Sequence, residues 1–211
     1  MKDIVIVGSG GFAKEVAFLI DEINKVNKIW NLLGYIDVSV GEENGKYTVY
    51  GTDDWLASID FEINVVFGVG DPVLLKRLQN KFKKNENLQY PNLIHPNVIG
   101  DWARISIGVG NIICASNTFT TDIKIGDFNI VNIDCTIGHD VEIGDFNVIN
   151  PSVNISGGVK VNDGVLLGTN ATILQNNQIC SDAIIGADGL VTKNIEKPGV
   201  YIGSPVKKIV K

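Results

Sequence analysis

Large apolar residues recur at every sixth position through the second half of the chain. The series runs without a break from Ile107 to Val191. Its members are Ile107, Ile113, Phe119, Ile125, Val131, Ile137, Ile143, Ile149, Ile155, Val161, Leu167, Ile173, Ile179, Ile185 and Val191. A helix repeats its faces about every 3.6 residues and a strand about every two, so a period of six indicates a different architecture.

A second series, with mostly small or β-branched members, lies two residues before the first and runs from Asn129 to Gly189. Because positions i and i−2 of a strand share a face, both series point inward. Each six-residue unit then holds a very short strand and a corner, and three units close one coil. Stacked coils bury a continuous apolar column, which predicts a three-sided parallel β-helix. We expect the Gly or Asn after many large residues, such as Gly138 and Asn132, to form the corners with positive φ.

Residues 1–90 follow a different pattern. Short β-branched strands are predicted at 3–8, 32–37 and 63–70, and helices at 12–24 and 72–84. Strands that alternate with helices are typical of βαβ units around a parallel sheet. The fold class predicted for this part is therefore α/β, as a small Rossmann-like domain.

The composition narrows the classes of partner. The net charge of −6 and the pI near 4.9 lead us to expect no nucleic-acid and no membrane partner, since both select basic surfaces. No apolar run is long enough to span a bilayer, and the apolar start of the chain ends in glycines rather than in a signal-peptide cleavage site. The scattered cysteines Cys114, Cys135 and Cys180 fit reduced thiols, so we expect a cytoplasmic protein.

The segment "VGSGGFAKEV" places Gly8, Gly10 and Ala13 between a predicted strand and a predicted helix. Such a turn lets backbone N–H groups at a helix N-terminus approach an anion. Asp37, at the end of "GYID", is a candidate acceptor for a ribose hydroxyl. Taken alone, the motif leaves open a dinucleotide, another nucleotide or a plain tight turn.

The stretch "IGDFNIVNIDCTIGHDVEIGDFNVI" resembles the hexapeptide repeat of the left-handed parallel β-helix acyltransferases, and "GVYIGSPVKKI" resembles their closing tail. A glycine turn before such a repeat resembles the bacterial sialic acid O-acetyltransferase-like and nucleotide-sugar N-acetyltransferase family. The resemblance implies a nucleotide-sugar-binding domain at 1–90, a left-handed β-helix acetyltransferase domain at 91–192 and a tail at 193–211. It also implies acetyl-CoA as co-substrate, no metal, and a homotrimer with active sites between adjacent helices.

By the same resemblance, the N-terminal domain holds the nucleotide sugar. Gly10, Gly11 and Phe12 are expected near the phosphates or the sugar, Asp37 near the nucleoside, and Gly70 at the edge of the pocket. The family often has His at the position of Phe12. The sugar or the nucleotide is therefore expected to differ from those of relatives with the histidine.

His139 is the candidate general base. The repeat places His139 and Asp140 at a corner, where nothing about the fold requires a histidine. A neutral imidazole suits the removal of a proton from an amine that attacks a thioester, and a carboxylate neighbour favours the imidazolium as it forms. The family has a His followed by an acidic residue in this role, and Asn132 matches a family position near the reacting centre. An exposed corner histidine and a corner asparagine are the alternative readings.

Gly157 follows His139 by one coil, so the two are expected side by side. Its N–H is a candidate donor to the thioester oxyanion, as in the family, and a simple bulge is the alternative. Thr169 and Ala187 match family positions along the pantetheine channel. Val148 stands where several relatives have a second histidine, and His95 is expected to be structural.

The predicted function is acetyl-CoA-dependent acetylation of the amino group of a UDP- or dTDP-linked amino-deoxy sugar, by direct transfer, in the synthesis of surface glycans. The alternatives are O-acetylation of a sugar of the sialic acid type and a non-catalytic trimeric nucleotide-binding scaffold. A zinc carbonic anhydrase of the same shape would need three histidines, and the chain has two.

Overall fold

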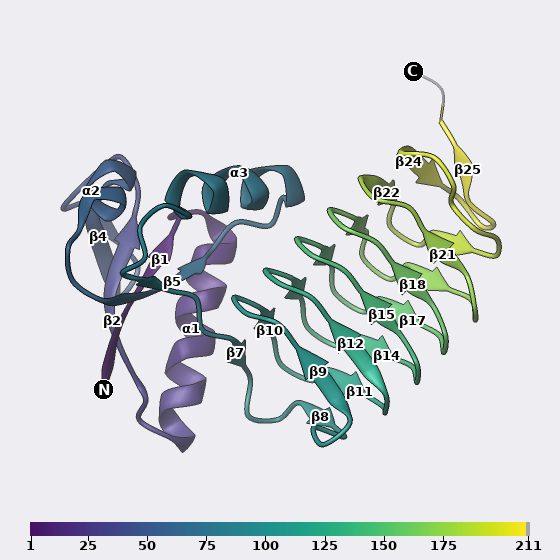
Figure 1. The fold of residues 1–211 in the computed structure, drawn as a ribbon, viewed down its shortest axis with the longest axis horizontal. Coiled ribbons are helices and arrows are strands. Elements are labelled where there is room, and N and C mark those ends of the chain that lie inside the picture. Colours follow the sequence, from purple (N-terminus) through teal and green to yellow (C-terminus); the bar gives the residue numbers. More distant parts are fainter. Residues whose placement is uncertain (210–211) are drawn as a thin grey trace. The chain divides into compact units, whose positions relative to one another are not determined.

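The structure of the protein is a computed structural model that describes residues 1–209 (Figure 1). The chain forms two compact units that divide after Pro96. Between residue 90, where the sequence placed this boundary, and Pro96 lies the short strand β7 (Leu93–Ile94). Within the described residues, none of the helices is long and apolar enough to cross a membrane.

The first unit is built on a mainly parallel sheet. Its strands are β1 (Lys2–Val7), β2 (Trp30–Ile36), β3 (Glu43–Asn44), β4 (Tyr47–Gly51), β5 (Ile63–Phe67) and β6 (Leu88–Gln89). They lie in the order β3-β4-β2-β1-β5-β6, and only the pair β3–β4 is antiparallel. The helices are α1 (Gly11–Val26), α2 (Asp53–Ser58) and α3 (Pro72–Phe82). The α/β prediction is confirmed, whereas the β3–β4 hairpin and α2 were not predicted.

The second unit is a parallel β-helix with three faces, which we name by the strands in the coil of His139. The β13 face holds β10 (Ile112–Ile113), β13 (Ile130–Val131), β16 (Val148–Ile149), β19 (Leu166–Leu167), β22 (Ala183–Ile185) and β24 (Gly199–Ile202). The β14 face holds β8 (Ile99–Gly100), β11 (Thr118–Phe119), β14 (Thr136–Ile137), β17 (Asn154–Ile155), β20 (Thr172–Ile173) and β23 (Leu190–Val191). The β15 face holds β9 (Ile105–Ile107), β12 (Ile123–Ile125), β15 (Glu142–Ile143), β18 (Lys160–Val161) and β21 (Gln178–Ile179).

Both six-residue series fill the interior of the β-helix. Ile137 pairs with Ile155, one coil further on, and the two are 1% and 2% exposed. Only the first member of the large series, Ile107, is half-buried rather than buried. Asparagines in the second series also form hydrogen bonds: the Oδ1 of Asn129 accepts the N–H of Asn147 at 2.9 Å. The buried amides therefore link successive coils by hydrogen bonds.

The prediction for the corner glycines is wrong in its detail. Positive φ falls two residues later than expected, at Asp140 with 59° and at Asp134 with 61°, and not at Gly138 or Asn132. Gly138 is small for another reason, since a Cβ there would lie 2.6 Å from the backbone nitrogen of Gly157. At Gly138, close stacking of coils rather than backbone conformation therefore favours glycine.

The segment expected as a tail at 193–211 continues the β-helix. Strand β24 pairs parallel with β22, and β25 (Lys207–Lys208) pairs antiparallel with β24. Ile195 forms an isolated bridge to Ile179 and is buried. These residues complete the pairing of the last coil, and residues 210–211 lie outside the described part.

Candidate active site

His139 and Asp140 form the corner between β14 and β15. Asp140 tolerates the positive φ that the corner imposes, as Asp and Asn do more readily than most residues. The imidazole Nδ1 lies 2.7 Å from Oδ2 of Asp140. Both side chains are exposed, at 61% and 66%. The carboxylate thus holds the ring through Nδ1, and residues 1–209 offer no hydrogen-bond partner to Nε2.

Gly157 lies against the imidazole ring of His139. A Cβ at this glycine would stand 2.6 Å from Nε2, 2.7 Å from Cε1 and 3.1 Å from Cδ2. Real Cβ atoms essentially never come within 3.0 Å of a heavy atom of this kind. The ring therefore keeps its place only while residue 157 has no side chain.

The N–H of Gly157 is left unpaired by the coil. Its neighbour Gly158 donates to the carbonyl of His139 at 2.8 Å, but the N–H of Gly157 itself has no acceptor among residues 1–209. At the β15–β16 corner the equivalent amide, that of Asp145, donates to Oδ1 of Asp163 in the next coil at 2.8 Å. An amide beside Nε2 that lacks this partner is available to a ligand.

The other residues expected around acetyl transfer lie at the β13–β14 corner. Asn132 directly follows β13, and its Oδ1 accepts the N–H of Ile133 at 2.8 Å. Thr169 and Ala187 occupy the same corner in later coils and are exposed. The β14 face separates this corner from His139. One chain therefore does not bring Asn132, Thr169 or Ala187 to the imidazole.

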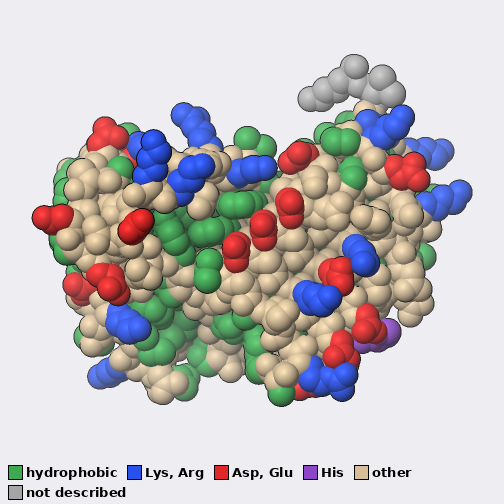
Figure 2. Space-filling model, in the orientation of Figure 1, with side chains coloured by type: hydrophobic (Ala, Val, Ile, Leu, Met, Phe, Trp, Pro, Cys, Tyr) green, Lys and Arg blue, Asp and Glu red, His purple; other side chains and the backbone are tan. Residues whose placement is uncertain are grey.

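The three faces differ in the side chains that they turn outward. The β15 face carries charges: Glu142 binds Lys124 at 3.0 Å and Lys160 at 3.1 Å, and basic and acidic side chains alternate there (Figure 2). These two lysines lower the pKa of the Glu142 carboxyl. On the β13 face the residues that alternate with the two inward series are apolar, and the first three are buried: Ile112, Ile130, Val148, Leu166, Ile184 and Val200. Those of the β14 face are uncharged: Ile99, Thr118, Thr136, Asn154, Thr172 and Leu190.

Val148 and His95 take no part in the corner of His139. Val148 is 2% exposed and lies on the β13 face. His95 directly follows β7 and is half-buried. Throughout residues 1–209 there is no group of three side chains that could hold a metal ion.

The turn between β1 and α1 leaves open space around Gly10 and Gly11. Gly8 has a φ of 96°, which favours glycine. Gly10 caps α1, and a Cβ on Gly10 or Gly11 would meet nothing within 4 Å. The turn packs closely at its base, because a Cβ on Gly68 would lie 2.7 Å from Cα of Ala13. The N-terminus of α1 therefore presents backbone N–H groups to open space, as a phosphate site requires.

Asp37 follows β2 and is tied to this turn. Its Oδ2 accepts the hydroxyl of Ser9 at 2.5 Å, and its Oδ1 accepts the N–H of Val38 at 2.7 Å. A cavity of about 190 Å³ opens beside them. It is lined by Ser9, Asp37, Ser39, Glu42, Glu43, Asn44 and Val49. The predicted nucleoside residue thus lies in a polar cavity next to the predicted phosphate turn.

Phe12 lies in the first turn of α1 and is half-buried, and Gly70 is exposed after β5. Asn44 was not predicted, yet its Nδ2 donates to the carbonyl of Ser9 at 2.6 Å. Asn44 belongs to a two-residue strand, which is too short to have a hydrophobic period. The only signal for it in the sequence is the turn glycine beside it, Gly45.

Comparisons with known proteins match both units. Residues 3–82 match the PglD N-terminal domain family. PerB from Caulobacter crescentus, solved in complex with CoA and GDP-perosamine, is 25% identical with a TM-score of 0.86, over 100% of this chain and 98% of PerB. WeeI from Acinetobacter baumannii is 25% identical with a TM-score of 0.81, over 99% and 100%. The acetyltransferase domain of PglB from Neisseria gonorrhoeae, 22% identical with a TM-score of 0.88 over 99% and 100%, shares the fold.

A comparison with curated proteins gave no match. The structural matches extend over the whole chain and include proteins with CoA or acetyl-CoA bound. The predicted order of a Rossmann-like domain and a left-handed parallel β-helix is confirmed. The chain is similar over its whole length to the hexapeptide-repeat nucleotide-sugar acetyltransferases, and its first unit matches the PglD N-terminal domain.

Proposed function

We propose that the protein transfers the acetyl group of acetyl-CoA to the amino group of a nucleotide-linked amino-deoxy sugar, with His139 as general base. The observation that carries the proposal is the corner itself. His139 is held at Nδ1 by Asp140, and its ring lies against a glycine whose N–H has no acceptor in the chain. PerB, bound to CoA and GDP-perosamine, supplies the substrate class.

The chemistry follows from these atoms. The sugar amine attacks the thioester carbonyl while Nε2 of His139 takes a proton from the nitrogen. Asp140 keeps the remaining ring proton on Nδ1 and stabilises the imidazolium. The N–H of Gly157 donates to the oxyanion, a contact that contributes about 3 kcal/mol in comparable sites. The C–S bond then breaks, and the imidazolium returns its proton to the departing thiolate.

The first unit would hold the nucleotide. The amides of Gly10 and Gly11 suit a diphosphate, with Phe12 and Gly70 at the side of the sugar and Asp37 at the ribose. The family resemblance led us to expect UDP or dTDP as the carrier, whereas PerB was solved with a GDP sugar. All three nucleosides therefore belong in a first substrate panel.

A second copy of the chain would complete the site. The β14 face is uncharged and lies between the corner of His139 and the corner of Asn132, Thr169 and Ala187. If copies of the chain pack around a symmetry axis beside this face, the His139 corner of one copy meets the Asn132 corner of the next copy. Ile133 lies at the Asn132 corner and Leu174 at the corner type of His139, and these apolar side chains are 48% and 42% exposed. Contact with a second copy would bury them. We propose a homotrimer on these grounds.

The test is thiol release from acetyl-CoA in the presence of UDP-, dTDP- and GDP-linked amino sugars, with CMP-sialic acid as the O-acetylation arm. Turnover with an amino sugar, and an N-acetyl product by mass spectrometry, is the expected result. An O-acetyl product would replace the proposal by sugar O-acetylation. Nucleotide binding without turnover on any sugar would contradict catalysis and favour the scaffold.

A mixing experiment tests the shared site. His139→Ala and Asn132→Ala subunits are each expected to be impaired when alone. Unfolded together and refolded into mixed trimers, they would form some interfaces with both native residues. Activity above that of either parent is expected, and equal activity would contradict a site shared between copies.

A further inference from the structure

The β3–β4 hairpin reaches the glycine turn through one side chain. The hairpin turns at Gly45, whose φ is 70°, and it pairs Asn44 with Tyr47. The side chain of Asn44 leaves this turn and donates from Nδ2 to the carbonyl of Ser9 at 2.6 Å. Ser9 immediately precedes Gly10, the residue that caps α1. Strand β4 is anchored to the sheet by its pairing with β2, whereas the two-residue strand β3 pairs only with β4, so side-chain attachments help to hold β3 and the turn in place.

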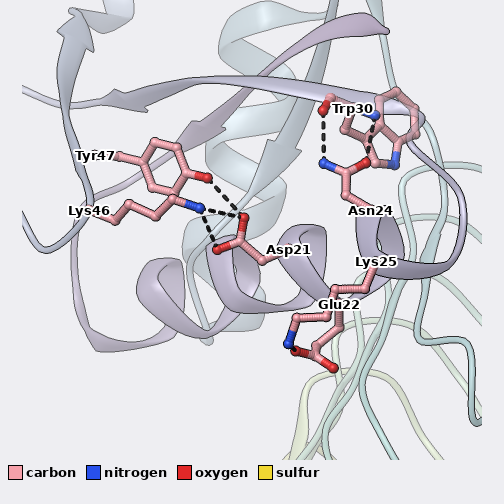
Figure 3. Close-up of polar contacts among 7 residues, drawn as sticks. All are labelled: Asp21, Glu22, Asn24, Lys25, Trp30, Lys46 and Tyr47. Atoms are coloured by element: carbon pink, nitrogen blue, oxygen red, sulfur yellow. Dashed lines mark hydrogen bonds and ion pairs between the residues drawn. The ribbon is translucent and has the colours of Figure 1, made fainter.

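A cluster of three residues attaches the hairpin to α1 (Figure 3). Asp21 of α1 accepts the Lys46 ammonium at 2.9 and 3.0 Å and the Tyr47 hydroxyl at 3.0 Å. Burial raises the pKa of Tyr47, so its hydroxyl stays protonated and donates. The ring of Tyr47 also packs edge-on against Tyr35, with 6.4 Å between centroids. The lysine is largely exposed and adds little alone, but the cluster as a whole adds to the β2–β4 pairing in holding the hairpin against α1.

The planarity of the peptide bond carries this attachment to the phosphate site. The carbonyl of Ser9 and the N–H of Gly10 belong to one rigid plane and point in opposite directions. Asn44 holds the carbonyl on one side, so the Gly10 N–H is directed to the other. The Ser9 hydroxyl is held by Asp37 at 2.5 Å, which leaves the residue little freedom to rotate.

We propose that Asn44 is a positioning residue that orients the Gly10 amide for the substrate diphosphate, and that the Asp21–Lys46–Tyr47 cluster holds the hairpin that carries Asn44. The inference rests on the proposed function and adds to it a determinant of substrate affinity outside the glycine turn. Loss of Asn44 leaves the peptide free to rotate and weakens the binding of the diphosphate, while the corner of His139 is untouched.

The experiment compares wild type, Asn44→Ala, Asp21→Asn and the double variant. The control is Glu22→Gln, which removes the exposed ion pair of Glu22 with Lys25 on the same helix. Calorimetry measures the Kd of the nucleoside diphosphate that the wild type binds, and steady-state kinetics measures both substrates. For Asn44→Ala we expect Kd and the KM of the nucleotide sugar to rise about tenfold. This is the effect of losing one hydrogen bond between the Gly10 amide and the diphosphate.

Comparing kcat with the two KM values distinguishes a positioning role of Asn44 from a general loss of structure. We expect kcat and the KM of acetyl-CoA to stay within about twofold, and Glu22→Gln to match wild type. Asp21→Asn should raise Kd less than Asn44→Ala does, and should add nothing in the double variant, because it acts through Asn44. Additive effects would contradict that route.

The failure of this inference is distinct from the failure of the proposed function. An unchanged Kd in Asn44→Ala, in an enzyme whose wild type acetylates its sugar, overturns the role of Asn44 alone. Equal losses in both KM values and in kcat would also overturn it, as would a Tm that falls together with activity. A wild type that binds no nucleoside diphosphate overturns both claims.

Discussion

Replacing Gly157 with alanine should displace the imidazole of His139, the proposed general base, without unfolding the protein. The new Cβ would lie 2.6 Å from Nε2 of His139, about 0.8 Å short of the 3.4 Å at which ordinary contact begins. The φ of Gly157 is outside the left-handed region, so the backbone accepts alanine. The imidazole is the mobile partner because 61% of its side chain is exposed. The ring must therefore move by nearly an ångström.

A displacement of about 1 Å between reacting groups costs about a hundredfold in rate. We therefore expect kcat of Gly157→Ala to fall about a hundredfold, or about 2.7 kcal/mol of transition-state stabilisation. The KM of the nucleotide sugar should stay unchanged, because the first unit is not altered. The free energy of unfolding should change by less than about 1 kcal/mol, since the ring swings into solvent.

The assay is steady-state acetyl transfer by Gly157→Ala, by His139→Ala and by the double variant. If the methyl group acts by moving the ring, it should cost little more once the imidazole is gone. A further large loss in the double variant would assign the effect to the amide of Gly157 instead. Wild-type kcat in the single variant would refute the geometry of the corner.

Three further changes are expected to have distinct effects. Asp140→Asn should lower kcat about tenfold with little change in either KM, because the ring keeps a partner but loses a charge in an exposed site; kinetics over both substrates checks this. Asn129→Ala leaves the buried N–H of Asn147 without its acceptor and should lower the free energy of unfolding by about 1–3 kcal/mol, measured in urea. Burial raises the pKa of Cys135 to about 11. Iodoacetamide at pH 8 should therefore not alkylate Cys135 in the native protein but should alkylate it after denaturation, which mass spectrometry checks.

The β-helix was predictable because its signal repeats. A single buried isoleucine says little, but Ile137, Ile143 and Ile149 in register with their neighbours specify a coil of fixed length. That length also placed Gly157 against His139, since residues one coil apart stack. The order of elements in the first unit followed in the same way from the periods of its longer strands and helices.

The conformation of the corners and the position of the β3–β4 hairpin were harder to predict from the sequence, for physical reasons. The sequence shows that Gly138 must be small, but not whether φ or a close approach to the next coil is the cause. Asn44 and Ser9 meet through one long-range hydrogen bond, which has no period and no local motif. To see that Asn132 and Thr169 lie at a different corner from His139, one must know which strand belongs to which face, and the stacked coils show this.

The most direct test of the account compares acetyl transfer by wild type and His139→Ala with the sugar that the panel identifies. We expect kcat/KM to fall at least about a hundredfold in the variant, while the Kd of the nucleoside diphosphate and the Tm stay close to wild type. A variant that retains wild-type kcat/KM would mean that another group removes the proton, and it would contradict the assignment of this corner as the active site.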